Sequence, residues 1–350
     1  MKTSTIFLAA SGMLTPVGFD SASTNAAIAT GISAYEDSKH HNKNFNPMRM
    51  ALIPEDALPP LNPELASLAV LTSRQRRILR IATPAIQEVI ASIPLKEPPA
   101  LFLALPESIP GAPFLVHQKF LEALEIQTNV KLDKTSSRIF AAGRAGGIEA
   151  IDHVFKYFAA SGKDVALVGG VDTYLDSLLL GILDKDNRIL AKNISDGFAP
   201  GEAAGFLLLV SERVKDYLPR PPKAEIFMPG LAIEPGYRYS EEAYRGDGLS
   251  NAFQLAIKNS DGNPIDAIYA SLNGEHFGAK ELGVAFMRNK SAFVENVKTE
   301  HPADCFGDIG AAFGPVLIAN AVASNQKNIL CYCSSEKQAR ASLVVTRFNH

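Results

Sequence analysis

The sequence SSRIFAAGRAGGIEAIDHVFKYFAASGKDVALVGGVD, residues 136–172, decides the fold. It opens with a short strand-like run, passes through a glycine-rich turn at residues 143–147 and continues as an apolar helix to about Phe158. A second apolar run, residues 164–172, ends close to a glycine pair and predicts a buried strand. A strand, a glycine-rich turn, a helix and another buried strand indicate a parallel βαβ unit. In such units, ligands and nucleophiles lie at the turn where the strand gives way to the helix N-terminus.

Outward from this unit, the chain reads as two similar strand-helix halves. The proline-rich segment at residues 219–222 marks a boundary, so we expect halves at 1–218 and 219–350 that form one compact unit. An irregular insertion is expected at residues 35–64. The other expected elements are a strand from about residue 5, a helix ending near Ala29, a helix over 73–92, strands over 100–105, 224–233 and 267–272, a helix over 248–258, and two neighbouring strands over 329–333 and 342–348.

The composition is that of an ordinary soluble globular chain. Of the 350 residues, 47% are hydrophobic, and the net charge of −3 gives no electrostatic reason for binding nucleic acid or an anionic membrane. The basic cluster Arg74, Arg76, Arg77 and Arg80 is expected to form a solvated helix face or dimer salt bridges. The three cysteines form neither a disulfide framework nor a metal site of recognised spacing, and no segment is long enough to span a membrane. We therefore expect a cytoplasmic protein with no metal and no cofactor.

Two segments resemble the β-ketoacyl synthase branch of the thiolase-like superfamily. In that family, the strand after the nucleophile's helix reads Asp-x-Ala-Leu-x-Gly-Gly, and a later segment reads Asp-Gly-Phe-x-x-Gly-Glu-Gly-Ala-Gly; residues 164–170 and 196–205 match them closely. The resemblance runs from about Ile6 to Phe348. It implies an α/β thiolase-like fold with duplicated strand-helix halves in five layers, α-β-α-β-α. Within these motifs, structural roles are implied for Gly169, Gly170, Gly201 and Glu202.

The reactive positions of the family are changed in this chain. The family keeps its nucleophilic cysteine in an Ala-Cys-x-x-Gly setting, and here that position is Gly143, which has no side chain to carry an acyl group. In the first histidine loop, the histidine position holds Glu275. The second histidine position holds Gly307 or Asp308, depending on the glycine used for alignment. Lys298 is the remnant of the family's lysine.

Other polar residues near these positions leave two interpretations open. His276 lies one residue late in the first histidine loop, and Cys305 precedes the second, so they are the candidate base and nucleophile of a remodelled site. The alternative is that exposed loops tolerate polar residues once catalysis is lost. Arg144, which would fill or cap the former pocket, and Asn273, which opens the first histidine loop, are the candidate binding residues.

The resemblance implies a ketosynthase-like protein that binds rather than catalyses. Two family settings fit: a small ketosynthase-like accessory or chaperone of a bacterial type VI secretion effector, or a chain-length-factor-like subunit in fatty acid or polyketide assembly. The short chain, the lost histidines and the replacement of the family's acyl-gating loop by residues 335–339 favour the first. A β-ketoacyl synthase-related enzyme with a remodelled site is the further alternative. Thiolase-like proteins pair through the strand before the nucleophile, here Ser136–Ala141, so we expect a dimer and a protein partner: an effector or secretion component, or a ketosynthase or acyl carrier protein.

Overall fold

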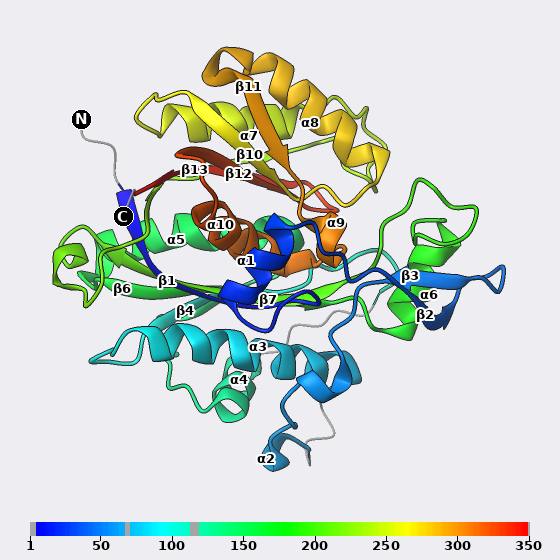
Figure 1. The fold of residues 1–350 in the computed structure, drawn as a ribbon, viewed down its shortest axis with the longest axis horizontal. Coiled ribbons are helices and arrows are strands. Elements are labelled where there is room, and N and C mark those ends of the chain that lie inside the picture. The colour runs from blue at the N-terminus through cyan, green and yellow to red at the C-terminus, as the bar shows by residue number, and fades with distance from the viewer. Residues whose placement is uncertain (1–4, 67–70, 113–118, 349–350) are drawn as a thin grey trace.

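Helices and strands alternate in five layers, which Figure 1 shows edge-on. The computed structural model describes residues 5–66, 71–112 and 119–348. Helices form three of the layers, in the order α7 (Asp247–Lys258) and α8 (His276–Arg288), then α5 (Gly146–Ser161) and α10 (Phe313–Ala323), then α3 (Ser73–Ser92) and α4 (Phe120–Thr128). Strands fill the two layers between them. The expected α-β-α-β-α arrangement is confirmed.

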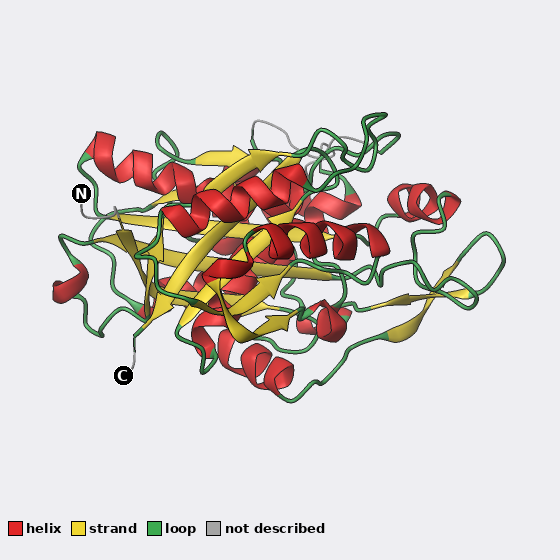
Figure 2. Ribbon diagram, turned by 90° about the horizontal axis from the view of Figure 1, so that it is seen from above, coloured by secondary structure: helices red, strands yellow, loops and turns green. Residues whose placement is uncertain are grey.

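The two halves of the chain repeat one strand order. The first half has the order β5-β4-β6-β7-β1 and the second β11-β10-β12-β13-β8, with parallel and antiparallel pairs at the same places in each. Since β8 pairs with both β1 and β13, the two layers join along one edge. Figure 2 shows, from above, helices lying over the strands. The strands are β1 (Thr5–Leu14), β4 (Ala100–Ala104), β5 (Arg138–Phe140), β6 (Val165–Thr173), β7 (Glu202–Ser211), β8 (Ala224–Phe227), β10 (Ile265–Ala270), β11 (Phe293–Glu300), β12 (Asn328–Ser334) and β13 (Ala339–Arg347), with β9 (Gly230–Ile233) on β13.

The middle helices carry the same duplication into the core. A short 3-10 turn precedes each of them: Gly143–Ala145 before α5 and Gly310–Ala312 before α10. Every residue of α10 from Phe313 to Val322 is buried, as expected for a helix that is apolar on all sides. The helix α3, by contrast, is amphipathic and begins with a capping box between Thr72 and Gln75, which accounts for the agreement with its expected range.

Close backbone approaches explain the glycines of the two family-like segments. A Cβ atom added at Gly169 would overlap the ring of Phe206, and one at Gly170 would overlap the carbonyl oxygen of Ala311, in the turn before α10. A Cβ atom at Gly201 would overlap the carbonyl oxygen of Phe306. Gly170 and Gly201 therefore let β6 and the chain before β7 lie directly against the second half, and Gly169 makes room for a ring of β7 within the first half.

Two segments differ from the sequence-based expectation. The insertion at 35–64 is not irregular throughout: it contains a hairpin of β2 (Glu36–His41) and β3 (Pro47–Met50), followed by the short helix α2 (Pro63–Ala66). This hairpin projects from the body in Figure 1. Its first strand, β2, is polar throughout, and β3 is only four residues long, although Met48 and Met50 on it are buried, so neither strand gives a clear sequence signal. The single strand expected over 224–233 is divided into β8 and β9 beside Pro229, which has no N–H to donate.

The basic cluster on α3 is neither a solvated face nor free for a dimer contact. The Nη2 atom of Arg74 lies 2.9 Å from Asp172, and both side chains are buried. The Nε atom of Arg77 donates to Glu202 at 2.7 Å. The expectation was wrong because an amphipathic pattern cannot distinguish an arginine that faces water from one that meets a buried carboxylate. Arg74 and Arg77 instead fix Asp172 and Glu202 on the strands beneath them, while Arg80 pairs with Glu55 before the helix.

No helix in the described ranges combines the length and apolar character needed to cross a membrane.

Replacing Gly170 by alanine tests the close packing between the two halves. We expect Gly170→Ala to lower the free energy of unfolding by about 1–3 kcal/mol, because the added methyl group meets the fixed backbone carbonyl of Ala311. Gly181→Ala is the matched control: this glycine is exposed in the helix Ser177–Lys185 with open space around it, and alanine there should add about 0.5–1 kcal/mol. Urea denaturation of both variants measures the difference, and equal effects would contradict this packing.

Candidate functional site

The 3-10 turn before α5 contains Gly143, which the sequence resemblance aligns with a nucleophilic cysteine. Gly143 has a φ of +60°, a conformation that side-chain-bearing residues seldom adopt. A Cβ atom built there would overlap the Oε1 atom of Glu107, which comes from the loop after β4. The turn is therefore closed to a side chain both by its backbone and by its neighbour.

Next to Gly143, the buried side chain of Arg144 pairs with Asp308. The Nε atom of Arg144 lies 3.1 Å from Oδ2 and 3.3 Å from Oδ1 of Asp308, and Nη2 also contacts Oδ2. Asp308 is fully buried and accepts two further hydrogen bonds, from the backbone N–H of Gly310 at 2.9 Å and from Nδ2 of Asn273 at 2.8 Å. Gly307, just before it, has a φ of +73° and leaves no room for a side chain against the carbonyl of Ala199. Of the two residues expected at the second histidine position, Gly307 and Asp308, only Asp308 carries a side chain that reaches Arg144, and its carboxylate neutralises that arginine.

The carboxylate of Glu336 lies among three arginines. Its Oε1 atom is 2.9 Å from Nη1 of Arg144 and 2.9 Å from Nη2 of Arg188, and its Oε2 atom is 3.2 Å from Nε of Arg238. Burial alone would raise the pKa of Glu336, but the positive charges of Arg188, Arg144 and Arg238 outweigh burial and hold that pKa well below its usual range. Glu336 is therefore an ionised carboxylate within the protein.

Glu275, at the first histidine position, completes the arrangement. Its two oxygens accept hydrogen bonds from Nε and Nη2 of Arg188 at 2.8 Å each, the paired geometry typical of arginine with carboxylate. Arg238 approaches Glu275 at 3.0 Å, and the side chain of Asn273 donates to it at 3.0 Å. Asn273 thus bridges Glu275 and Asp308, the two carboxylates that replace the family's histidines.

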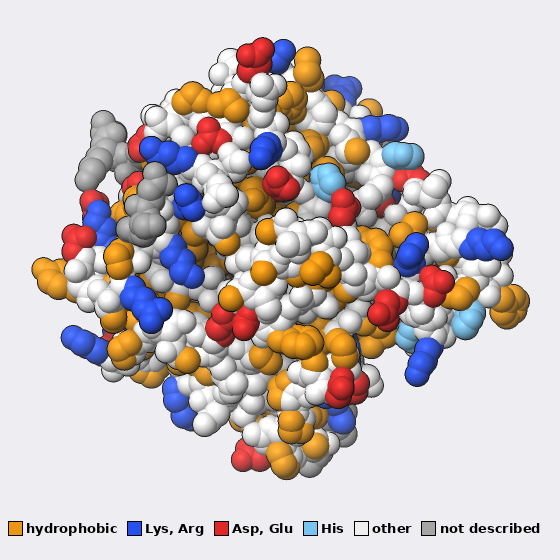
Figure 3. All heavy atoms as spheres, viewed as in Figure 1, with side chains coloured by type: hydrophobic (Ala, Val, Ile, Leu, Met, Phe, Trp, Pro, Cys, Tyr) orange, Lys and Arg blue, Asp and Glu red, His pale blue; other side chains and the backbone are white. Residues whose placement is uncertain are grey.

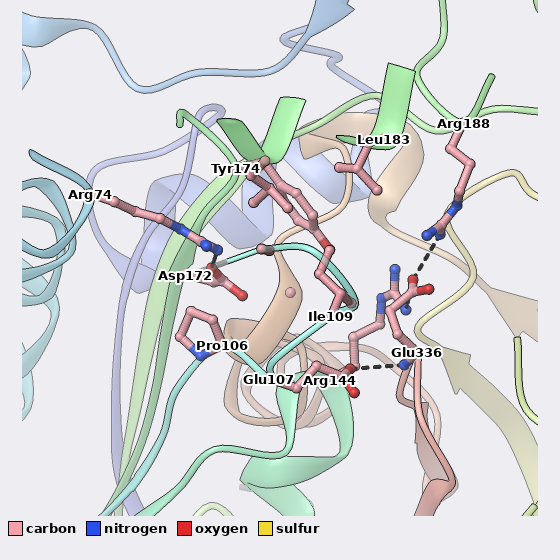
Figure 4. A pocket seen from close by; sticks show the side chains of 14 residues that line it. Arg74, Pro106, Glu107, Ile109, Arg144, Asp172, Tyr174, Leu183, Arg188 and Glu336 are labelled. Carbon is pink, nitrogen blue, oxygen red and sulfur yellow. Dashed lines mark hydrogen bonds and ion pairs between the residues drawn. The ribbon is translucent and has the colours of Figure 1, made fainter. Parts of the chain in front are cut away.

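These six residues form what we call the central ion-pair cluster: Arg144, Arg188, Arg238, Glu275, Asp308 and Glu336. Three positive and three negative charges balance, as buried charges require. Figure 4 shows Arg144 and Arg188 turned toward Glu336. The cavities on the two sides of Glu336 have volumes of about 30 Å³ each, room for water but far below the ~300 Å³ of an ordinary ligand pocket. Among the described residues, the cluster and its two small cavities thus leave no room for an ordinary ligand at this place.

Glu107 connects the cluster to the turn between β12 and β13. Its carboxylate accepts hydrogen bonds from the backbone N–H groups of Glu336 at 2.8 Å and Lys337 at 3.0 Å. Burial, followed by the negative charge of Glu336, raises the pKa of Glu107 to about 7. Its protonation therefore changes near neutral pH.

The structure does not bring the remaining candidate residues together. His276 is exposed at the start of α8, where its Nδ1 atom lies 3.3 Å from Asp196. Cys305 lies in the central core, and burial, followed by the charge of Asp304, raises the pKa of its thiol, which disfavours the reactive thiolate. No interaction joins Cys305 to His276 within the described part of the chain, and Lys298 is exposed on β11, outside the cluster.

Sequence reasoning found half of the cluster. Glu275 and Asp308 were named because the resemblance aligns them with the family's histidines, and Arg144 because it lies beside Gly143. Arg188, Arg238 and Glu336 were missed, because each lies in a loop and no sequence spacing connects it to its partners. A carboxylate in a motif that is expected to be buried could have shown that arginines were missing from the prediction, because a buried carboxylate needs a positively charged partner.

Comparison with known proteins gives the fold. No protein-family model matches the sequence, and no curated protein matches it. Among solved structures, it is similar to the ishigamide ketosynthase/chain length factor, with 14% identity over 99% of this chain and 100% of that one, and a TM-score of 0.79. It is also similar to the ketosynthase from module 6 of the bacillaene synthase of Bacillus subtilis 168 (11% identity, 99% of this chain and 72% of that one, TM-score 0.78).

A third similar structure is a ketosynthase in complex with its chain length factor from Xenorhabdus doucetiae, with 14% identity over 99% of this chain and 98% of that one, and a TM-score of 0.72. This chain has the ketosynthase fold. At these identities the likeness establishes the fold, and the site must be interpreted from its own residues. Within the described ranges, no three His, Cys, Asp or Glu side chains are grouped as metal ligands.

Removing one arginine tests whether the cluster stabilises the fold. We expect Arg188→Met to lower the free energy of unfolding by about 3–5 kcal/mol, because it leaves Glu275 and Glu336 buried with fewer partners. Arg213→Met is the matched control, since Arg213 pairs with Asp164 at 2.7 Å but is largely exposed, and its loss should cost within about 1 kcal/mol. Equal losses in urea denaturation would argue against a stabilising cluster.

The raised pKa of Glu107 predicts a pH dependence of stability. Between the unfolded pKa of about 4.3 and the folded pKa of about 7, the folded protein holds a proton that the unfolded chain has lost. The stability from this group is thus fully present below the unfolded pKa and is lost as the pH rises to about 7. We expect the difference in unfolding free energy between the natural protein and Glu107→Gln to fall across this range and level off above it. A difference independent of pH from 4 to 8 would refute the assignment.

Proposed function

We propose that this chain is a non-catalytic ketosynthase-like protein that acts by binding another protein. The observation that carries the proposal is the nucleophile turn, where Gly143 provides no thiol and Glu107 fills the space that a side chain would need. Condensation in the ketosynthase family needs a thiolate to take the acyl group and imidazoles to donate to the developing enolate. The corresponding positions here hold Gly143, Glu275 and Asp308, and the two carboxylates are already bound to arginines.

The surface that we propose for binding is the free edge of β5. This strand ends the sheet order, pairs only with β4 in the described structure, and leaves Arg138 exposed. An unpaired strand edge is a template for pairing with another chain. A second copy of the chain across a two-fold axis, or a ketosynthase in place of that copy, would complete the sheet at this edge.

Two biological settings follow for such a binding protein. The first is an accessory or chaperone of a bacterial type VI secretion effector, supported by the β12–β13 turn, whose Glu336 occupies the cluster instead of gating an acyl channel. The second is a chain-length-factor-like subunit, supported by the full-length likeness to a ketosynthase/chain length factor. Purification of the tagged protein from its host separates them: an effector or secretion component supports the first, and a ketosynthase or acyl carrier protein supports the second.

Restoring the thiol tests the loss of catalysis. We expect neither the natural protein nor Gly143→Cys to form an acyl-enzyme with an acyl thioester or to release carbon dioxide from malonyl-carrier protein. The new side chain would need a strained φ, would meet Glu107, and would face no imidazole. Intact-mass spectrometry and carbon dioxide release are the measurements. The double variant Gly143→Cys/Glu107→Ala is the control: its thiol should react with a small alkylating reagent, yet release no carbon dioxide. Turnover by the natural protein would overturn the proposal.

Cysteine cross-linking tests pairing through β5. The native cysteines are buried, so a single exposed cysteine reports on its own surroundings. A two-fold axis at β5 places the two copies of this strand side by side, and Arg138→Cys should then yield a disulfide-linked dimer on mild oxidation. Lys258→Cys on the outer helix α7 should stay monomeric in the same conditions. A monomeric Arg138→Cys protein would contradict the homodimer.

A further inference from the structure

Glu336 differs from the other carboxylates of the central ion-pair cluster in how it is held. Asp308 is fixed through Gly310 and Asn273, and Glu275 through Asn273. Glu336 reaches the cluster from a short turn between β12 and β13, and its carboxylate meets only the guanidinium groups of Arg144, Arg188 and Arg238 among the described residues. The Glu336 carboxylate therefore resembles a bound ligand, because it contacts three arginines that belong to other segments of the chain.

The fit of this carboxylate is incomplete. Its Oε1 atom lies 2.9 Å from two arginines, but its Oε2 atom, 3.2 Å from Nε of Arg238, accepts no hydrogen bond in the described structure. The guanidinium group is a planar fork suited to paired contacts with both oxygens of a carboxylate. Because Glu336 is attached to the β12–β13 turn, its carboxylate does not make the paired contact with a guanidinium group that a free carboxylate could make.

The space around Glu336 is suited to a small acid. The two cavities of about 30 Å³ lie on either side of it, and Arg144 and Glu336 line both. Removing the Glu336 side chain would therefore join them beside the three arginines. It would also leave three guanidinium groups facing two carboxylates, Glu275 and Asp308, so that one negative charge restores the balance.

We propose that Arg144, Arg188 and Arg238 form a binding site for the carboxylate group of a small organic acid, and that Glu336 occupies this site as a tethered competitor. The turn that carries Glu336 is closed by other contacts: Glu107 accepts from its N–H groups, and Nη1 of Arg340 donates to three of its carbonyl oxygens. Tethering gives Glu336 a high effective concentration, which excludes weak carboxylate ligands from the intact protein. This inference does not depend on the protein partner proposed above.

Chemical rescue of Glu336→Ala tests this site. The variant should melt at a lower temperature than the natural protein, and formate or acetate should raise its melting temperature by at least about 2 °C, with saturation as the concentration increases. Chloride at equal ionic strength should give no saturable rise. Glu336→Gln is the matched control: it removes the charge but keeps the volume, so carboxylates should not rescue it. The natural protein should also show no rise, because Glu336 fills its site.

Three outcomes would overturn the proposal. They are no carboxylate-dependent rise in Glu336→Ala, an equal rise with chloride, and an equal rise in Glu336→Gln or the natural protein. If Glu336→Ala does not fold alone, the same test is made by refolding it in acetate and in chloride. Recovery of folded protein in acetate only supports the site, and equal recovery, or none in either salt, contradicts it.

Discussion

The buried pair between Arg144 and Asp308 is the contact on which the centre of this molecule depends. Arg144 lies in the turn before α5, and Asp308 lies just before the corresponding turn at α10, so the pair joins equivalent places of the two halves. Both side chains are withdrawn from water, and neither charge is tolerable there without the other. Asn273 and Glu336 connect the other charged residues of the central ion-pair cluster to this pair.

The same pair shows how the centre of a ketosynthase fold can be held together by ion pairs. The duplicated strand order and the close glycine contacts of β6 hold in place the two 3-10 turns that precede α5 and α10. Ketosynthase catalysis at such turns requires side chains that are not engaged in ion pairs: a thiol with a lowered pKa and imidazole groups that are free to donate hydrogen bonds. Here guanidinium and carboxylate groups satisfy one another instead, and the cavities that remain hold little more than water. Packed, ion-paired side chains occupy this part of the molecule, and among the described residues only the two small cavities remain open there. On the face that Figure 3 shows, acidic and basic side chains are interspersed.

How far the sequence predicts this molecule depends on the range of the interactions involved. The strand-turn-helix unit at 136–172, the helix α3 and the final strand pair follow from local patterns and were found. The hairpin β2–β3 was missed because β2 is polar and β3 spans only four residues, and the break at Pro229 because an apolar run extends across it. In the site, Gly143, Glu275 and Asp308 follow from aligned positions. Arg188 and Glu107 reach the cluster from loops far away in sequence, and no spacing connects them to their partners.

A double-mutant cycle between Arg144 and Asp308 tests the central claim most directly. The free energy of unfolding is measured for the natural protein, Arg144→Met, Asp308→Asn and the double variant, in urea at fixed pH and salt. If the pair joins the halves as described, the two single losses exceed the loss of the double variant by about 1–3 kcal/mol. Losses that add to within about 0.5 kcal/mol would mean that the two residues act independently, and would contradict the account of this centre as an interdependent cluster.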